Sequence, residues 1–317
     1  MDGALIIDKP AGVTSHDVVA RVRRLAGERR VGHTGTLDPF ATGVLVVLVG
    51  RATRLAQYLS GAQKEYEAVI RLGYATDTGD VTGTRLEFED NFTAETQRPQ
   101  SLSREEIEAA MASLRGQIEQ TPPMYSAKKI AGRKLYELAR RGEEIERKPV
   151  RVTVKDFEAI GDDGSLLTLN ADGSGDLRIR VVCSAGTYIR TLAEDFGKHL
   201  GLGAHVASLR RTRAGRFVIA EAITFERLGE LAESVKIETA LVSPDAAMAH
   251  LPAVNLGDDD VSRTLHGIDL RIEHAETSSW PDGQAVRLRN EAGDLIAVGA
   301  YDKDLRTLHP KVVIANP

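Results

Sequence analysis

One carboxylate, that of Asp38, stands in a segment whose neighbours could leave it open to a ligand. The segment runs from Gly32 to Gly43 and reads GHTGTLDPFATG. Its glycines permit left-handed backbone and close approach by a ligand, and Pro39 pushes Asp38 toward an extended conformation. The apolar run Val44–Val49 follows at once and predicts a buried strand. A rigid carboxylate at the lip of such a strand could do catalytic chemistry, although Asp-Pro and glycine-rich stretches are more often simple turns.

The bulk composition sets limits on the class of protein. The 317 residues suffice for one large domain and a small one, and 42% hydrophobic with 27% charged residues is ordinary for a soluble globular protein. No apolar run approaches a membrane span, and the N-terminus lacks the basic segment of a secretory signal. The single cysteine, Cys183, excludes an internal disulfide and a cysteine-based zinc site, which fits a reducing cytoplasm. Histidines at ligand spacing are missing too, so we expect no metal.

The distribution of charge says more than the net charge of −5. A solvated face explains any one basic cluster, but three clusters flanking the candidate loop and two other motifs predict a footprint for a phosphate backbone. The clusters are Arg21, Arg23, Arg24, Arg29 and Arg30; Lys128, Lys129, Arg133, Lys134, Arg140, Arg141, Arg147 and Lys148; and Arg210, Arg211, Arg213 and Arg216. Acidic residues concentrate elsewhere, as at Asp258–Asp260.

Strands and helices must position the Asp38 loop and the basic clusters. The first half of the chain predicts several such elements. We expect a strand over 4–8, a helix that Thr14 and Asp17 open and Gly27 ends, and a helix over 51–60. Alternation over 65–72 predicts a strand with Tyr66, Ala68, Ile70 and Leu72 on one face. Residues 76–80 have the composition of a turn.

The second half of the chain predicts a similar mixture of helices and strands, followed by a C-terminal part that contains short strands alone. Ser103 with Glu106 opens a helix that closes at Gly116, and a short helix is expected near 133–141. Strands are expected near 150–160 and 177–182, loops at 161–164 and 170–176, and a helix from Thr187 to about Gly201. After 244–252 the chain reads as short strands, at 265–270, 285–288 and 295–301, which predict a separate small β-domain.

Several further motifs stand in order along the chain. They are DKPAGVTS at 8–15, KEYEA at 64–68, SAGTYIRTL at 184–192, GAHV at 203–206 and LRRTR at 209–213. Together with Gly32–Gly43 they resemble the bacterial TruB-type tRNA pseudouridine synthases across roughly residues 3–250. The segment from Met124 to Tyr136 resembles the RNA-gripping insertion of the bacterial branch and argues against the relatives that work inside guide-RNA particles.

The resemblance implies an α+β fold: a large mixed β-sheet with flanking helices (the pseudouridine synthase fold) plus a small C-terminal β-rich, PUA-like domain. Residues 1–248 would form the catalytic domain, with the basic RNA-gripping insertion at about 120–149. Residues 249–317 would form the small domain. The C-terminal part matches less well, because it is short and acidic in places.

The implied reaction converts uridine to pseudouridine in the T-loop of tRNA, at position 55 by family resemblance. The base flips out, the C1′–N1 bond breaks and C1′ rejoins C5; no atom is gained or lost, so no cofactor is expected. The resemblance makes Asp38 the catalytic carboxylate. It could attack C1′ as a nucleophile or take a proton from C2′, and the sequence leaves both routes open.

The resemblance also assigns the residues around Asp38. Arg190 would pair with Asp38 and keep its carboxylate charged. Tyr66 would stack on the flipped base and, as a supporting catalytic residue, could also handle the C5 proton late in the reaction. Substrate binding would further use His33, Tyr188 and Leu209. The RNA backbone would meet Lys128, Lys129, Arg133, Lys134, Arg210 and Arg211. Lys9 and Pro10 would shape the region without reacting.

Two other functions compete with this one. An RNA-binding or tRNA-folding module without catalysis is disfavoured by the presence of Asp38, Tyr66 and Arg190 together. A nucleoside hydrolase would need an activated water with a second acid or a metal, and the motifs offer no partner carboxylate. The expected partner is the T-arm stem-loop of tRNA. We expect no membrane, no guide-RNA complex, a monomer and a cytoplasmic location.

Overall fold

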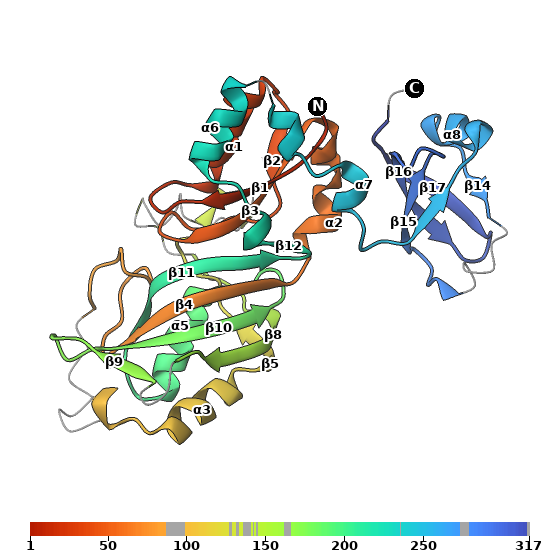
Figure 1. Ribbon diagram of the computed structural model, residues 1–317. Helices are drawn as coiled ribbons and strands as arrows, with labels where there is room; N and C mark the ends of the chain where they lie inside the picture. The colour runs from red at the N-terminus through yellow and green to blue at the C-terminus, as the bar shows by residue number, and fades with distance from the viewer. Residues whose placement is uncertain are drawn as a thin grey trace.

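The computed structural model describes residues 1–86, 99–126, 129–130, 133–135, 141, 143, 145–161, 166–234, 236–272 and 279–315. Two sheets organise the described chain (Figure 1). The larger has ten strands, in the order β1-β3-β11-β4-β10-β8-β5 with β2, β9 and β12 attached, and the smaller has five. The larger sheet is mixed, because β3 and β11 run parallel while the other neighbours in that order are antiparallel. Together with the helices, this confirms the predicted α+β class.

The bounds of the elements follow. The larger sheet contains β1 (Gly3–Lys9), β2 (Val31–His33), β3 (Thr42–Val49), β4 (Lys64–Leu72), β5 (Gly116–Gln120), β8 (Val150–Ala159), β9 (Leu167–Leu169), β10 (Gly175–Cys183), β11 (Ala204–Ala214) and β12 (Phe217–Val218). The smaller sheet contains β13 (Ala253–Asn255), β14 (Leu270–Arg271), β15 (Ala285–Arg289), β16 (Leu295–Asp302) and β17 (Thr307–Val313). A separate ribbon pairs β6 (Lys129–Ile130) with β7 (Arg133–Lys134).

The helices are α1 (Ser15–Ala26), α2 (Ala56–Ser60), α3 (Arg104–Ser113), α5 (Ile189–His199), α6 (Phe225–Glu233), α7 (Pro244–Ala247) and α8 (Asp258–Leu265). Short 3₁₀ turns are η1 (Gly50–Leu55), η2 (Pro99–Ser101), η3 (Ile219–Glu221) and η4 (Ile237–Ala240). No helix in this part of the chain is long and apolar enough to cross a membrane.

The sequence of β3 is apolar without interruption because the strand is buried on both of its faces. Leu45, Val47 and Val49 pack against α1 and α6 on one face. Val44, Val46 and Leu48 pack on the other face, with η1, α2 and residues of the smaller sheet. Both faces are therefore buried, and a strand buried on both faces needs no polar alternation. The predicted strand is confirmed, and it gives the Asp38 loop a rigid exit.

Strand β4 shows the alternation that was predicted. Tyr66, Ala68, Ile70 and Leu72 are buried together with α3 and α5. The intervening side chains face the opposite side of the sheet, where Glu65 pairs with Arg180 and Arg213. One face of β4 thus belongs to the core that carries Tyr66.

The predicted helix termini are partly correct. Thr14 caps α1: its hydroxyl accepts a hydrogen bond from the Asp17 N–H at 3.1 Å, the Asp17 carboxylate accepts from the Thr14 N–H at 2.8 Å, and Gly27 ends the helix at φ +61°. The expected 51–60 helix is a 3₁₀ turn followed by α2. The helix predicted from Thr187 begins at Ile189.

Other predictions were wrong, and each has a physical reason. Of the strand expected at 265–270, Leu265 ends α8, His266 and Gly267 form a turn, and only Leu270 lies in a strand, β14. Helix α8 forms ahead of it because Asp258–Asp260 occupy its first turn, where carboxylates stabilise the positive end of a helix. In the larger sheet, strands β2, β5, β9, β11 and β12 were not predicted. Of the short helix expected near 133–141, Arg133–Lys134 lie in β7 and residues 136–140 lie outside the described residues.

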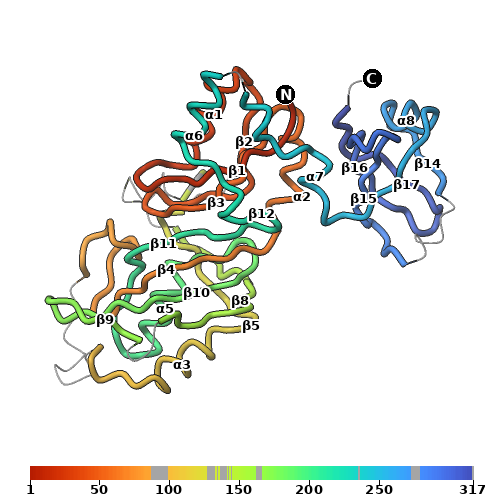
Figure 2. Tube along the Cα trace, in the orientation of Figure 1, coloured from red at the N-terminus to blue at the C-terminus, as the bar shows by residue number. Residues whose placement is uncertain are grey.

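The two sheets share an apolar cluster. Figure 2 shows the C-terminal part of the chain next to α2 and α7. Leu295, Val298 and Ile314 of the C-terminal part are buried in the same cluster as Ala4 and Val46. Polar contacts fasten the same junction: Arg54 donates to the Val313 carbonyl at 2.9 Å, and Arg287 pairs with Asp245 at 2.9 Å. The smaller sheet is therefore packed onto the larger one.

Candidate functional site

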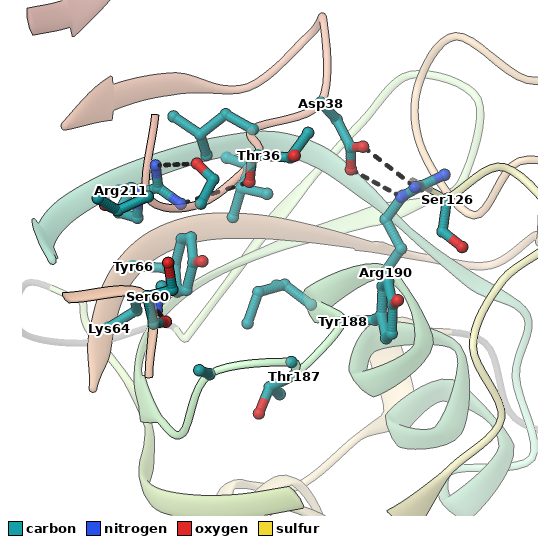
Figure 3. A pocket seen from close by; sticks show the side chains of 17 residues that line it. Thr36, Asp38, Ser60, Lys64, Tyr66, Ser126, Thr187, Tyr188, Arg190 and Arg211 are labelled. Atoms are coloured by element: carbon teal, nitrogen blue, oxygen red, sulfur yellow. Dashed lines mark hydrogen bonds and ion pairs between the residues drawn. The ribbon is translucent and has the colours of Figure 1, made fainter. Parts of the chain in front are cut away.

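A cavity of about 250 Å³ opens between the Asp38 loop, β4 and the start of α5. Its lining includes Asp38, Tyr66, Tyr188, Arg190 and Leu209. Asp38 and Arg190 lie on one side, and Tyr66, with Lys64 and Arg211, lies on the other (Figure 3). The structure thus brings five residues predicted for the site to one pocket.

The Asp38 loop is fastened to the segment that joins β1 to α1. The Leu37 N–H donates to the Ser15 hydroxyl oxygen at 2.9 Å, and that hydroxyl donates to the Leu37 carbonyl at 3.1 Å. On the other side of Asp38, the Pro39 carbonyl accepts from the Lys9 ammonium at 3.2 Å and from the Gly12 N–H at 2.8 Å. Both neighbours of Asp38 are therefore held, which fixes where its side chain can point.

Lys9 serves this loop from a fully buried position. Besides Pro39, its ammonium donates to the carbonyls of Pro10 and Val13 at 2.9 and 2.7 Å. Burial lowers the pKa of Lys9 to about 8. The three acceptors of its ammonium are backbone carbonyls, so Lys9 shapes the loop, as the sequence suggested.

Arg211 supports the loop from the opposite side, and this corrects a prediction. It was expected on the RNA backbone, but only 2% of its surface is exposed. Its guanidinium donates to the carbonyls of Val44, Gly35 and Thr36 at 2.7, 3.0 and 3.4 Å. Because these carbonyls occupy its donors inside the pocket wall, Arg211 holds the loop and is not a surface phosphate ligand.

Gly43 makes the contact between β3 and β11 possible. Its φ is +100°, and a Cβ there would collide with the Arg211 backbone. Glycine is the residue that tolerates this backbone at no steric cost. We expected the glycines of this segment to permit a left-handed backbone. Gly43 has a positive φ, whereas Gly32 and Gly35 have φ values that any residue can adopt.

Arg190 and Asp38 form a two-point ion pair. Nε lies 3.0 Å from Oδ2, and Nη2 lies 3.2 Å from Oδ1. Arg190 is 4% exposed, and its other donors are used as well: Nη1 contacts the Thr78 carbonyl at 2.9 Å, and Nη2 contacts the Tyr125 carbonyl at 2.6 Å. A fork fixed at both ends orients the carboxylate of Asp38.

Asp80 is a member of this network that sequence reasoning missed. Its Oδ2 lies 3.4 Å from Arg190 Nη1, and the residue is 4% exposed. Its Oδ1 accepts from the hydroxyls of Thr78 and Thr82 at 3.0 and 2.6 Å. The segment was interpreted only as a turn. The threonines two residues on either side of Asp80 were the available sign, since they can satisfy a buried carboxylate.

The environment of Asp38 alters its acidity. Burial raises the pKa of the carboxyl, the Arg190 guanidinium opposes this, and the nearby Asp80 charge adds to the rise. The side chain still keeps 32% of its surface accessible. Asp38 is thus a partly open carboxylate whose charge depends on its counter-ion.

A pH dependence of activity follows from this shift. The ionised carboxylate is the form that can attack or take a proton, and a raised pKa means that Asp38 takes up its proton at a higher pH than the free side chain, about 3.9. We therefore expect the single-turnover rate at saturating RNA to fall on the acid side, with a midpoint above that value. Circular dichroism at each pH controls for unfolding, and a rate that stays level down to the free-aspartate midpoint contradicts the prediction.

Strands β4 and β11 form one wall of the pocket. Tyr66 is 7% exposed and faces Arg211 across the strand pair, while Leu209 is 7% exposed and faces Ala68. Burial raises the pKa of Tyr66 and of Tyr188, which keeps both phenols protonated. The pocket lining therefore offers one leucine and two tyrosines whose phenols are neutral.

The remaining predicted residues lie away from this centre. His33 ends β2 beside Thr34, with its ring edge-on to His16 at 5.6 Å; burial lowers its pKa to about 4, so it is neutral near pH 7. Arg210 pairs with Asp8 at 2.7 Å and remains partly exposed. Arg133 is exposed and pairs with Glu143 at 3.2 Å. Lys128 lies outside the described residues, and Lys129 and Lys134 are described by their backbone in β6 and β7.

Within the described ranges, no group of three or more His, Cys, Asp or Glu side chains could hold a metal ion.

Comparison with protein families covers most of the chain. Residues 23–189 match the model described as "TruB family pseudouridylate synthase (N terminal domain)". Residues 190–248 match that of the "tRNA pseudouridylate synthase B C-terminal domain". Curated proteins called tRNA pseudouridine synthase B are similar throughout. The relative from Thermobifida fusca is 46% identical over 92% of this chain and 96% of its own length, and that from Pseudomonas paraeruginosa is 40% identical over 96% and 94%.

Solved structures show the same architecture. A chain in the structure described as "Structure of H/ACA RNP bound to a substrate RNA containing 2'-deoxyuridine" superposes with a TM-score of 0.71 and 26% identity, over 99% of this chain and 85% of that one. A chain of an "archaeal box H/ACA sRNP Nop10-Cbf5 complex" gives 0.69 and 26%, over 99% and 86%.

Proposed function

The chain belongs to the TruB family of pseudouridylate synthases, and from that membership we propose that it isomerises the uridine at position 55, in the T-loop of tRNA. It is an enzyme, an isomerase that converts uridine in tRNA to pseudouridine. The observation that supports the proposal best is the ion pair of Asp38 and Arg190, which lies at a pocket lined by Tyr66, Tyr188 and Leu209.

The chemistry needs a carboxylate at the sugar. In the proposed reaction Asp38 acts at the ribose of the flipped uridine, by attack on C1′ or by removal of the C2′ proton, while C1′–N1 breaks. Arg190 keeps that carboxylate charged and aimed, because its Nε and Nη2 each hold one oxygen. The uracil then turns within the pocket and C5 bonds to C1′, while the Asp38–C1′ bond breaks or, on the other route, C2′ takes back its proton. C5 loses its proton and N1 gains one, so no atom is gained or lost overall.

The pocket wall recovers part of the cost of flipping. Taking a base from its stack costs a few kcal/mol, and stacking on an aromatic ring returns about 1–3 kcal/mol per base. Tyr66 supplies the ring in this proposal, with Leu209 and Tyr188 enclosing the uracil. His33 and Arg210, with Lys128, Lys129, Arg133 and Lys134 of the insertion, are proposed to meet the surrounding RNA.

Substitutions of Tyr66 separate stacking from proton handling. Tyr66→Phe keeps the ring, so we expect RNA binding and base capture to persist while any step that uses the phenol slows. Tyr66→Leu loses both, and we expect it to cost about 1–3 kcal/mol of stacking in addition. Single-turnover rates and dissociation constants for a T-arm RNA measure this. Equal rates for the two variants would show that the ring does not stack on the base.

The arrangement of the chain supports further proposals. Residues 1–248 carry catalysis, with the basic insertion at 120–149, and residues 249–317 form an accessory PUA-like domain. We propose that the enzyme acts as a monomer without a guide RNA, because the insertion resembles that of the bacterial branch and the curated relatives compared above are tRNA pseudouridine synthases B. Its tRNA substrate gives it a cytoplasmic location.

One experiment tests the proposed function. The protein is incubated with a transcribed T-arm stem-loop, and pseudouridine is then mapped at each uridine, with wild type and Asp38→Asn in parallel. We expect product at position 55 from wild type alone. RNA bound without product would indicate the RNA-folding module, and free uracil would indicate a hydrolase.

A further inference from the structure

Tyr188 begins α5 without the usual cap. It is the N-cap residue of the helix, and a tyrosine side chain cannot accept the hydrogen bonds that serine, threonine or aspartate take at this position. No capping box forms either, so no side chain of the helix accepts from the Tyr188 N–H, and this backbone takes its partners from elsewhere in the chain. Arg190 lies two residues later, in the first turn (Figure 3).

Gln120 supplies those partners from 68 residues away. Its Oε1 accepts from the Tyr188 N–H at 2.9 Å, and its Nε2 donates to the Tyr188 carbonyl at 3.3 Å. That carbonyl also accepts the first helical bond, from the Leu192 N–H at 3.0 Å. One side-chain amide thus holds both polar groups of a single peptide residue.

The position of Gln120 in β5 sets it apart from its neighbours. It is 1% exposed, whereas Gln117 and Glu119 of the same strand are exposed. A buried amide must be hydrogen-bonded or it costs stability. Both hydrogen bonds that its side-chain amide makes go to Tyr188, so the buried amide is satisfied by that one residue.

The chain that leaves Gln120 reaches the same place again. Five residues later, the Tyr125 carbonyl accepts from Arg190 Nη2 at 2.6 Å, and the segment between is fastened by Arg147, which donates to the Pro122 carbonyl at 3.1 Å. Residues 120–125 therefore contact α5 both at the backbone before Arg190 and at its guanidinium.

We propose that Gln120 is a positioning residue of the isomerase: by clamping Tyr188 at its N–H and C=O, it sets where α5 begins and thus where Arg190 meets Asp38. The inference rests on the proposed catalytic use of that ion pair. Gln120 touches neither carboxylate nor substrate and acts through the backbone of Tyr188. A small displacement of an aligned group can reduce a rate by about 100-fold.

The first test removes the clamp and compares the same change on the same strand. Gln120→Ala should lower the single-turnover rate at saturating T-arm RNA by about 10- to 100-fold, with the RNA dissociation constant unchanged. Gln117→Ala, at an exposed position, should match wild type. A wild-type rate for Gln120→Ala overturns the proposal, and so does a loss that appears only in RNA affinity or in the folded fraction.

The second test distinguishes positioning from general support of the fold. In Gln120→Glu, an ionised carboxylate accepts from the Tyr188 N–H but repels the Tyr188 carbonyl. The protonated carboxyl can again donate to that carbonyl, and burial raises the pKa of the new group. The ratio of its rate to that of wild type should therefore rise as the pH falls.

Controls isolate this readout. Arg190, Asp38, Asp80 and Arg147 carry the charge around the segment in both proteins, so the ratio to wild type reports the change made at position 120. Gln120→Ala and Gln117→Glu should show flat ratios, with thermal unfolding followed at each pH. A flat ratio for Gln120→Glu overturns the proposal. A wild type that forms no pseudouridine would instead overturn the proposed function.

Discussion

Asp38→Asn is expected to abolish pseudouridine formation while the protein still folds and binds RNA. The amide keeps the shape of the side chain but cannot act as a nucleophile or a base, so the rate should fall by at least about 10³-fold. The fold should persist because Arg190 keeps Asp80 and the carbonyls of Thr78 and Tyr125 as partners. Single-turnover assays and RNA binding by filter retention give the two quantities.

A matched control lies close by. Asp77 is exposed in the 76–80 turn, and its Oδ1 accepts from the Thr84 N–H at 2.8 Å, a bond that an asparagine oxygen can keep. Asp77→Asn should leave the rate unchanged. If Asp38→Asn still formed product at more than a trace of the wild-type rate, the carboxylate would not be the catalytic group.

Arg190→Lys should slow turnover severely although it preserves the charge. A lysine ammonium is a single point, whereas Arg190 contacts both Asp38 oxygens, Asp80 and two carbonyls at once. The Asp38 carboxylate would lose its orientation, and we expect a fall of about 10²–10³-fold in the rate at saturating RNA. Circular dichroism and thermal melting should report a folded protein.

Arg71 provides the comparison for this change. It makes the same two-point contact with Asp176, at 2.7 and 2.8 Å, on β4 and β10. Arg71→Lys should have a near-normal rate, because that pair lies outside the pocket lining. A near-normal rate for Arg190→Lys, or an equal loss of rate in Arg190→Lys and Arg71→Lys, would show that the ion pair of Arg190 and Asp38 has no specific part in the mechanism.

Periodicity predicted the elements that bury regular faces. The alternation in β4 and the doubly buried run in β3 each follow from one local pattern, and both strands were located to within two residues. The start of α5 was misplaced because Thr187 has the side chain of a cap. Its hydroxyl instead donates to the Ser184 carbonyl at 3.0 Å, and Tyr188 depends on Gln120. Because the hydrogen bonds to Tyr188 come from Gln120 on a distant strand, the sequence around the start of the helix contains no pattern that reveals them.

The site shows the same division between local and distant causes. Asp38 and Arg190 are 152 residues apart, so only the family resemblance could pair them. Arg211 was misassigned because its charge was weighed without its position. On a strand, residues two apart share a face, and Leu209 was already expected in the pocket, so Arg211 belonged to the same side.

The apolar cluster shared by the two sheets has a consequence for how the molecule melts. Leu295, Val298 and Ile314 cannot leave it without exposing side chains of β1 and β3 to water. Unfolding of the smaller sheet therefore destabilises β1 and β3, the strands that flank the Asp38 loop, because it exposes their apolar side chains. The stabilities of the C-terminal sheet and of the strands next to the pocket are therefore coupled. Truncation of the last strand would lower the stability of the strands that hold the Asp38 loop.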